Sequence, residues 1–397
     1  MMVQAERSSL CIFEANPLPH SGTTRTAARD PMRRADDAAR WRRSHRWFAA
    51  REAQKSVVMH RLKLAVALLL SLALDGLSRL RAADGLVLDL PLACTLGETC
   101  VVQQYVDHDP SPAARDYQCG TLSYDGHNGT DFRLPSLAAQ RAGVDVLAAA
   151  PGVVLRVRND MDDLAMAEGG PVALGARLCG NGVVVAHREG WETQYCHLAK
   201  ASVRVAPGQS VGAGTPLGRV GLSGATVFPH LHFTVRHHGL IVDPFAFAAP
   251  AESCGGGTSL WRPTLAAGLA YRARVVLNAG FAAGPVSMEA VEAGAADSFA
   301  AAGADAAAIV AYVRSIGLKA ADVQELLVHA PDGSILVDHR ADALSRNEAQ
   351  SLLFVGKKRP PGGWPAGVYR ASYRVLAHGA PVLERSFSLA LPAARAP

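Results

Sequence analysis

The stretch Pro229-His230-Leu231-His232-Phe233-Thr234-Val235-Arg236 is the most informative part of this chain about its fold. Its two histidines are two residues apart, so in a strand both imidazoles project from one face while Leu231 points to the other. Apolar residues alternate here with polar ones, which favours a strand over a helix. We therefore predict a strand that presents two imidazoles side by side. Two solvent-exposed histidines on an edge strand are the alternative.

Around this strand, between about residues 119 and 247, short β-rich runs are separated by glycine and proline. Short strands at close spacing with turn residues between them predict an all-β sheet or barrel-like domain. The runs are Val144 to Ala149, Val153 to Arg158, Gly182 to His187, Glu192 to His197, Leu217 to Val220 and Leu231 to Arg236. The stretch from Asp160 to Leu178 interrupts this rhythm and is predicted to be a surface insertion.

Two further stretches carry side chains that can bind a metal or move a proton. In Gly126-His127-Asn128-Gly129-Thr130-Asp131 the glycines allow a tight turn, which would bring the imidazole and the carboxylate of this loop to one point. This imidazole, this carboxylate and one histidine of the strand would together supply three ligands, two nitrogens and one oxygen. Three protein ligands leave the fourth position of zinc open for chemistry. A hydrogen-bonded surface pair is the alternative. The other stretch is Tyr195-Cys196-His197-Leu198.

Taken together, the three stretches resemble the lysostaphin-like (LytM-type) zinc endopeptidases, which cut peptide cross-links in bacterial peptidoglycan. The resemblance covers about residues 119–247, a third of the chain. It implies an all-β fold with a LytM-type β-sheet peptidase domain. Its framework of glycines and prolines consists of Val146-Leu147-Ala148-Ala149-Ala150-Pro151-Gly152-Val153-Val154, Pro207-Gly208-Gln209-Ser210-Val211, Leu217-Gly218-Arg219-Val220-Gly221 and Val242-Asp243-Pro244.

The resemblance also implies roles for five side chains. His127, Asp131 and His232 would bind Zn²⁺, and His197 and His230 would stay unliganded beside the open position. A neutral imidazole there can take a proton from the attacking water and return it to the leaving amine. Which of the two histidines is the general base stays open.

The chain departs from the family pattern in two places. Phe228 occupies a position before Pro-His-Leu-His that is commonly glycine in the family, so the loop Ser223 to Pro229 is expected to be stiffer. The insertion Asp160 to Leu178 is also unusual, and we expect it to wall or cap the substrate groove. Neither departure removes one of the five side chains.

The beginning of the chain carries the features of export. Residues 1–58 lack apolar periodicity and are predicted to be a start-site extension or a disordered basic tail. Residues 59–82 are predicted to be a signal peptide, because a basic start at Met59 precedes an apolar run, Leu64 to Leu74, that is too short to span a bilayer. A basic tail ahead of a buried core helix is the alternative.

The charge of the chain follows from that segment. The formal net charge is +5, and residues 1–58 alone hold 11 Lys and Arg against 6 Asp and Glu. Without residues 1–82 the chain has 25 Lys and Arg against 28 Asp and Glu, so the mature protein would be slightly acidic. We therefore expect neither nucleic acid as a partner nor a stable membrane span after removal of the signal.

Six cysteines follow the predicted signal, and an even number in an exported chain predicts disulfides, for which 15 pairings are possible. Cys94 with Cys100 would close a short loop, and Cys179 with Cys196 would bridge neighbouring strands. Cys119 and Cys254 would then be left to form the third disulfide. Zinc binding by these cysteines is disfavoured, because the chain has no C-x-x-C pair.

The rest of the chain completes the predicted organisation. Residues 83–254 form the zinc endopeptidase domain with its core at 119–247, residues 255–261 a linker, and residues 262–397 a small immunoglobulin-like β-sandwich without evident chemistry. Strands of that sandwich are expected at Tyr271 to Leu277, Glu325 to His329, Ser334 to Val337, Val368 to Leu376 and Val382 to Leu389. Tyr369 at a strand entrance is typical of a tyrosine corner.

These observations predict a periplasmic or secreted zinc metalloendopeptidase that hydrolyses stem-peptide cross-links of peptidoglycan. The D-Ala to diaminopimelate cross-link is the expected bond, with Gly-Gly bridges as the alternative. The alternative of another class is a non-catalytic peptidoglycan-binding module or amidase activator. No role is assigned to four other histidines, of which His187 is expected to be structural, His237 and His238 solvated, and His108 a loop residue.

Overall fold

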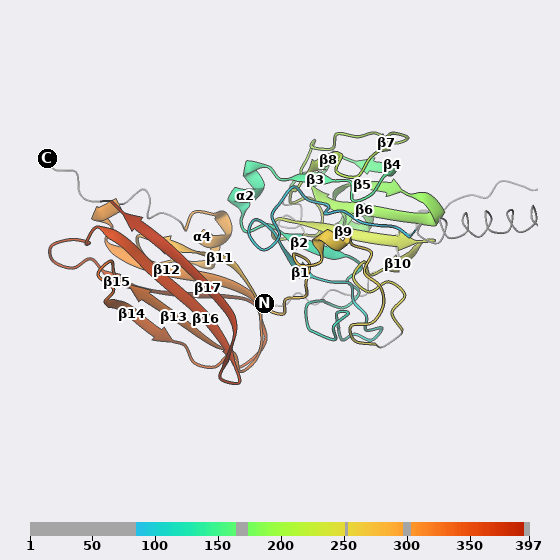
Figure 1. Ribbon diagram of the computed structural model, residues 1–397. Coiled ribbons are helices and arrows are strands. Elements are labelled where there is room, and N and C mark those ends of the chain that lie inside the picture. The colour runs from blue at the N-terminus through green and yellow to red at the C-terminus, as the bar shows by residue number, and fades with distance from the viewer. Residues whose placement is uncertain (1–84, 164–173, 251–252, 297–302, 393–397) are drawn as a thin grey trace, which may run out of the picture. The chain divides into compact units, whose positions relative to one another are not determined.

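The computed structural model describes residues 85–163, 174–250, 253–296 and 303–392 (Figure 1). The described residues from Leu86 onward belong to one compact unit. The predicted extension 1–58 and signal peptide 59–82 lie outside the described residues. Within the described ranges, no helix has both the length and the apolar character needed to cross a membrane.

Nearly all regular secondary structure among the described residues is β-strand, which confirms the prediction of an all-β fold. One large sheet has the order β1-β2-β9-β6-β5-β4-β7, with β10 on β9, and every neighbouring pair is antiparallel. Its strands are β1 (Val101–Gln104), β2 (Thr130–Arg133), β4 (Gly152–Arg158), β5 (Asn181–Ala186), β6 (Trp191–Leu198), β7 (Ser210–Val211), β9 (His230–His237) and β10 (Leu240–Val242). A separate pair joins β3 (Asp145–Leu147) to β8 (Pro216–Arg219).

The strand predicted from residues 229–236 is β9, at the centre of this sheet between β2 and β6. Leu231, Phe233 and Val235 are buried in the main hydrophobic core, as the alternation predicted. The two histidines and Thr234 therefore lie on the opposite face. This central position puts the imidazoles between two neighbouring strands that can contribute further side chains.

The C-terminal part consists of two sheets that share one hydrophobic core, which supports the prediction of a sandwich. Tyr369, Ala371, Tyr373 and Val375 are buried, and the Tyr369 hydroxyl donates to the Pro365 carbonyl at 2.9 Å, as in a tyrosine corner. One sheet contains β11 (Val275–Ala282), β12 (Ala308–Leu318) and β15 (Glu348–Lys358), and the other contains β14 (Ile335–Arg340), β13 (Val323–His329), β16 (Gly367–Ala377) and β17 (Ala380–Leu391). The immunoglobulin-like assignment and the domain boundaries stay predictions.

Several strands have no local signal strong enough to predict them. The short strand β2 lies in a glycine-containing stretch that looks like a loop, and β12 follows an alanine-rich region. β1, β7, β10 and β15 were not predicted either. Two short helices, α2 (Leu137–Ala142) and α4 (Met288–Ala293), begin at the serine caps Ser136 and Ser287. Leu260 and Trp261, at the end of the predicted linker, are buried in the main core.

The three disulfides are those that the spacing of the cysteines suggested. Cys94 is bonded to Cys100, Cys119 to Cys254, and Cys179 to Cys196. The last pair joins the segment before β5 to the end of β6, so it lies next to His197.

Candidate metal centre

Three of the predicted site residues meet where β2 runs beside β9. Asp131 is the direct register partner of His232, and His127 lies in the turn before β2. The sequence analysis placed Asp131 in a loop, which is wrong. It belongs to β2, a strand that pairs with β1 on one side and with β9 on the other.

The ligand atoms of these residues form a small triangle. Asp131 Oδ1 lies 2.9 Å from His232 Nδ1 and 3.2 Å from His127 Nε2, and the two nitrogens are 3.2 Å apart. Ligands about 2.0–2.1 Å from a tetrahedral zinc ion would be roughly 3.3 Å from one another. The three edges are close to that value, so the three residues could hold one metal ion.

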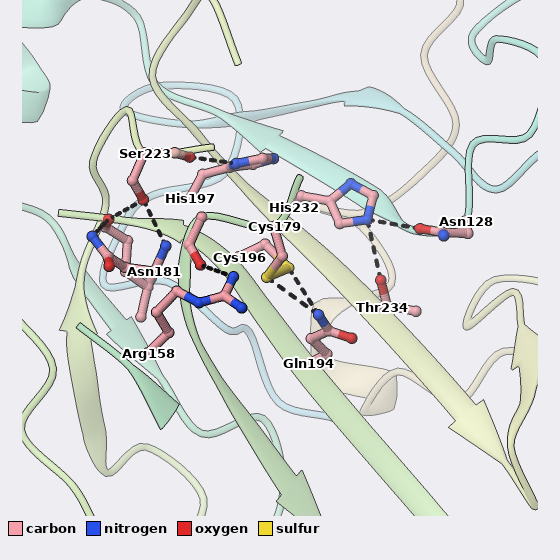
Figure 2. Close-up of a disulfide and its surroundings, with 12 residues drawn as sticks. Asn128, Arg158, Cys179, Asn181, Gln194, Cys196, His197, Ser223, His232 and Thr234 are labelled. Atoms are coloured by element: carbon pink, nitrogen blue, oxygen red, sulfur yellow. Dashed lines mark hydrogen bonds between the residues drawn. A yellow bond between two sulfur atoms is a disulfide. The ribbon is translucent and has the colours of Figure 1, made fainter. Parts of the chain in front are cut away.

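The outer hydrogen bonds of the two imidazoles decide which nitrogen faces the triangle. The Tyr105 carbonyl is 2.6 Å from His127 Nδ1 and can only accept, so Nδ1 carries the proton and Nε2 the lone pair. His232 Nε2 lies 3.0 Å from Asn128 Oδ1 and 3.1 Å from Thr234 Oγ1, as Figure 2 shows. With its proton on Nε2, His232 turns the lone pair of Nδ1 toward Asp131.

Three lone pairs therefore converge within hydrogen-bond distance of one another. Three acceptors cannot satisfy each other without a proton or a cation between them. Outer partners that orient ligating imidazoles in this way are typical of metal sites in proteins. The donor set and its orientation thus fit a divalent metal that prefers nitrogen and oxygen ligands.

The charges of the site also favour a cation. Although burial opposes ionisation of Asp131, the imidazoles of His127 and His230 hold the pKa of its carboxyl well below the usual range. Burial lowers the pKa of His232, which keeps its imidazole neutral near pH 7. Burial opposes protonation of His127 too, but the Asp131 carboxylate outweighs it and raises the pKa of that imidazole. A metal ion would compete with a proton for the Nε2 lone pair of His127.

The other two predicted residues lie beside the triangle. The ring centroids of His197 and His230 are 4.7 Å apart, and that of His197 is 5.9 Å from His232. His197 Nδ1 lies 2.9 Å from the Ser223 carbonyl oxygen, and His230 Nδ1 lies 3.0 Å from the Phe228 carbonyl oxygen. Both carbonyls can only accept, so the proton of each imidazole is on Nδ1 and the lone pair on Nε2. Burial lowers the pKa of both imidazoles, that of His197 well below its usual range. The structure thus brings together all five predicted side chains.

The sequence analysis missed the side chains and carbonyls that orient these five. Asn128 directly follows His127, and Thr234 lies two residues after His232 on the same face of β9, so the stretches themselves contained a signal for them. Tyr105 and Ser223 act through their backbone carbonyls, for which no residue pattern exists. The ring of Tyr124 lies 4.5 Å from that of His127 and is 45% exposed, so it flanks the site at the surface.

The remaining histidines differ in part from expectation. His187 is structural as predicted, with its nitrogens 2.8 Å from the Pro151 carbonyl and 2.8 Å from Thr193 Oγ1. His108 forms a 2.8 Å pair with Asp243, a partner that is remote in sequence. His237, predicted to be solvated, is half-buried, and its ring stacks on that of Trp191 with 4.1 Å between the centroids. His238 is exposed, as predicted.

Comparison with known proteins finds similar sequences over the part of the chain that contains this site. Residues 125–244 match the model of peptidase family M23. The chain is 33% identical to the peptidoglycan DD-endopeptidase ShyA of Vibrio cholerae over 127 residues, which is 32% of this chain and 24% of that protein. It is also 33% identical over 125 residues to the cell division protein DipM of Caulobacter vibrioides, covering 32% of this chain and 17% of that protein.

A crystal structure of a zinc-containing peptidase from Vibrio cholerae is 26% identical, with a TM-score of 0.23, and the match covers 36% of this chain and 39% of that one. The match spans a quarter or less of the length of ShyA and of DipM. The shared part contains all five clustered side chains. Over residues 125–244, the chain carries a LytM-type domain of peptidase family M23.

Proposed function

We propose that this protein is an exported zinc metalloendopeptidase that hydrolyses the peptide cross-links of bacterial peptidoglycan. The observation that carries the proposal is the convergence of three lone pairs, from His127, Asp131 and His232, beside two further buried imidazoles. A structural metal site would have no need of that second pair. The family match over residues 125–244 supports the same reaction class.

The three ligands suit zinc, the metal that we propose for this site. Two imidazole nitrogens and one carboxylate oxygen, with a fourth position left open, are typical of catalytic zinc sites. When bound, zinc supplies the Lewis acidity that polarises a peptide carbonyl and activates water. Asn128, Thr234 and the Tyr105 carbonyl hold the ligands in the required orientation.

His197 and His230 would handle the proton. Burial keeps both imidazoles neutral near pH 7, so each can accept a proton at Nε2. One of them would take the proton of the attacking water and deliver it to the leaving amine. A protonated imidazole beside the tetrahedral carbon would also stabilise the developing oxyanion.

The substrate proposal rests on the relatives and on the predicted export. ShyA is named a peptidoglycan DD-endopeptidase, and we propose the same class of bond, D-Ala to diaminopimelate, for this chain. Gly-Gly bridges are the alternative substrate. Residues 59–82 would be removed as a signal peptide, so N-terminal sequencing of the exported protein should find a start near Ala83 and a periplasmic or secreted location.

Muropeptide analysis tests the proposal. Zinc-loaded protein incubated with sacculi should convert cross-linked dimers to monomers, and His232→Ala should abolish both zinc binding and this conversion. His238→Ala is the matched control, because that histidine is exposed on the same chain and should leave both unchanged.

The same assay separates an enzyme from a non-catalytic module. A peptidoglycan-binding module or amidase activator would bind sacculi in a pull-down but leave the dimers intact. If the zinc-loaded wild type leaves dimers untouched on both diaminopimelate-type and glycine-bridged sacculi, the enzyme proposal fails.

A further inference from the structure

His197 has an unusual backbone. Its φ is 63°, in the left-handed region that favours glycine. A non-glycine residue keeps such a conformation only where its surroundings enforce it, and such residues gather at functional sites. His197 therefore calls for a physical account of what holds it and what the conformation achieves.

The conformation belongs to a bulge between β5 and β6. Val183 pairs with Tyr195 and Asn181 with Leu198, so Cys196 and His197 together face the single residue Gly182. A bulge of this kind inserts one extra residue into a strand and redirects its side chains.

The bulge decides which way the imidazole points. Tyr195 is buried in the main core, and in a regular strand the residue two positions later would face the core as well. The extra residue reverses this alternation. Leu198 returns to the core, and His197 joins the face that carries His230 and His232. Without the bulge, His197 would face away from the site.

The disulfide between Cys179 and Cys196 closes over this bulge. Its Cα atoms are 4.8 Å apart, and the His197 amide donates to the Cys179 carbonyl at 2.8 Å (Figure 2). On the other side, the Gly221 amide donates to the His197 carbonyl at 2.8 Å. The residue is thus held at its amide, at its carbonyl and through the neighbouring sulfur.

A second set of hydrogen bonds, around Ser223, fixes the ring of His197 itself. The His197 Nδ1 proton is directed at the Ser223 carbonyl, 2.9 Å away, which leaves Nε2 as the basic nitrogen. The Ser223 hydroxyl donates to the Leu198 carbonyl at 2.6 Å and accepts from the Asn181 amide at 2.8 Å, as Figure 2 shows.

The segment that contains Cys179 and the loop that contains Ser223 are in close backbone contact. A Cβ on Gly180 would lie 2.4 Å from the Ser223 carbonyl oxygen, and one on Gly224 would lie 2.3 Å from the Leu178 oxygen. The segment that contains Cys179 therefore packs directly against the loop that contains Ser223. Anchoring Cys179 to Cys196 anchors both the bulge and the acceptor of the imidazole proton.

We propose that the Cys179–Cys196 disulfide and Ser223 are positioning elements that hold His197 with its Nε2 toward the scissile bond. This inference rests on the proposed hydrolase function. It concerns proton transfer and not metal binding, because none of the three candidate ligands lies on the segments joined by this disulfide. Cys196 is, however, the register partner of His232 on β9, so bound zinc has to be measured together with kcat.

The expected effect follows from how strongly general bases depend on geometry. A positioned base contributes about 10²–10⁴-fold to a rate, and a misplacement of about 1 Å costs roughly 10²-fold. The double variant Cys179→Ala/Cys196→Ala should therefore lower kcat by about 100-fold, with KM changed less than about threefold. Bound zinc should remain at one ion per chain.

The Cys94–Cys100 disulfide offers a matched control. It also closes a short loop, of sequence separation 6 against 17, but it lies before β1. Cys94→Ala/Cys100→Ala should keep kcat within about threefold of wild type, whatever it does to thermal stability. Ser223→Ala keeps the carbonyl that accepts from His197 but removes the two hydrogen bonds of the Ser223 hydroxyl, so kcat should fall about tenfold. This variant is a milder test of the proposal if the cysteine variant fails to fold.

A measurement independent of activity completes the experiment. In ¹⁵N-histidine NMR spectra of the zinc-loaded protein, His197 should give a slowly exchanging Nδ1 proton, assigned by its loss in His197→Gln. This signal should vanish in Cys179→Ala/Cys196→Ala and persist in the Cys94–Cys100 control.

The possible outcomes separate the two proposals. An active wild type with an equally active Cys179→Ala/Cys196→Ala variant overturns the positioning role alone. A parallel loss of zinc and activity in that variant also overturns it, because the disulfide would then be supporting the metal site. An inactive wild type that keeps the NMR signal refutes the proposed hydrolase function and leaves the geometric assignment of His197 intact.

Discussion

Replacing Glu292 by glutamine should destabilise this protein, because one carboxylate then no longer neutralises two buried arginines. Glu292 Oε2 accepts from Arg133 Nη2 at 2.6 Å and also from Arg314 Nη1. Both arginine side chains have 0% exposure, so two buried cations share one carboxylate. Burial lowers the pKa of Arg133 to about 10, which still leaves it charged at neutral pH.

The magnitude follows from the charges that would be left. An ion pair at about 4 Å is worth about 4 kcal/mol at an effective dielectric constant near 20, and removal of one partner of a buried pair typically costs about 3–5 kcal/mol. Gln103, Asn278 and the Pro135 carbonyl still accept from the two guanidinium groups, which places the expected loss at the lower end. A loss of about 3 kcal/mol corresponds to a Tm decrease of roughly 6–12 °C.

Differential scanning calorimetry at pH 7 measures this decrease. Glu348→Gln is the matched control, because its partner Arg346 is 79% exposed and such surface pairs contribute about 0–1 kcal/mol. A Tm of Glu292→Gln no lower than that of the control would refute the argument that this carboxylate stabilises both arginines.

Three further predictions concern the site and its surroundings. Gly129→Ala should weaken zinc binding about 10–100-fold in a chelator competition, because its Cβ would lie 2.7 Å from His232 Nε2, whereas Gly284→Ala, in open space, should not. Phe228→Ala should lower kcat/KM about threefold to tenfold on muropeptide dimers, because Phe228 packs between the Arg133 guanidinium and the His230 ring; an unchanged value would exclude this contact from catalysis. Burial lowers the pKa of His187 below 6.5, so the unfolded chain binds more protons there and stability should fall as pH drops through 6.5. His187→Gln should flatten this dependence of Tm on pH, and an equal slope in both proteins would contradict it.

The chain's local patterns were sufficient for much of the fold. Alternation in β9 predicted which of its side chains are buried, because successive residues of a strand face opposite sides. Cysteine spacing pointed to the three disulfides. The motifs around His127, His197 and His230 also named the five side chains that the structure brings together.

Other strands depended on partners far away in sequence. β2 has four residues and no clear pattern, and it forms by pairing with β9 about a hundred residues later. β12 is buried along nearly its whole length between two neighbours, so it shows no alternation between buried and exposed residues. Such pairings arise from tertiary packing and leave little trace in the local sequence.

What the sequence determined by itself is therefore which side chains meet at the site and which face of β9 is buried, since these depend on residue type and on a period of two. Only the tertiary structure decided the orientation of the groups. Asp131 faces His232 through strand register, His197 reaches the site through a bulge, and the Tyr105 and Ser223 carbonyls select the free nitrogens of the imidazoles. These features depend on backbone atoms, which every residue has, so no residue pattern records them.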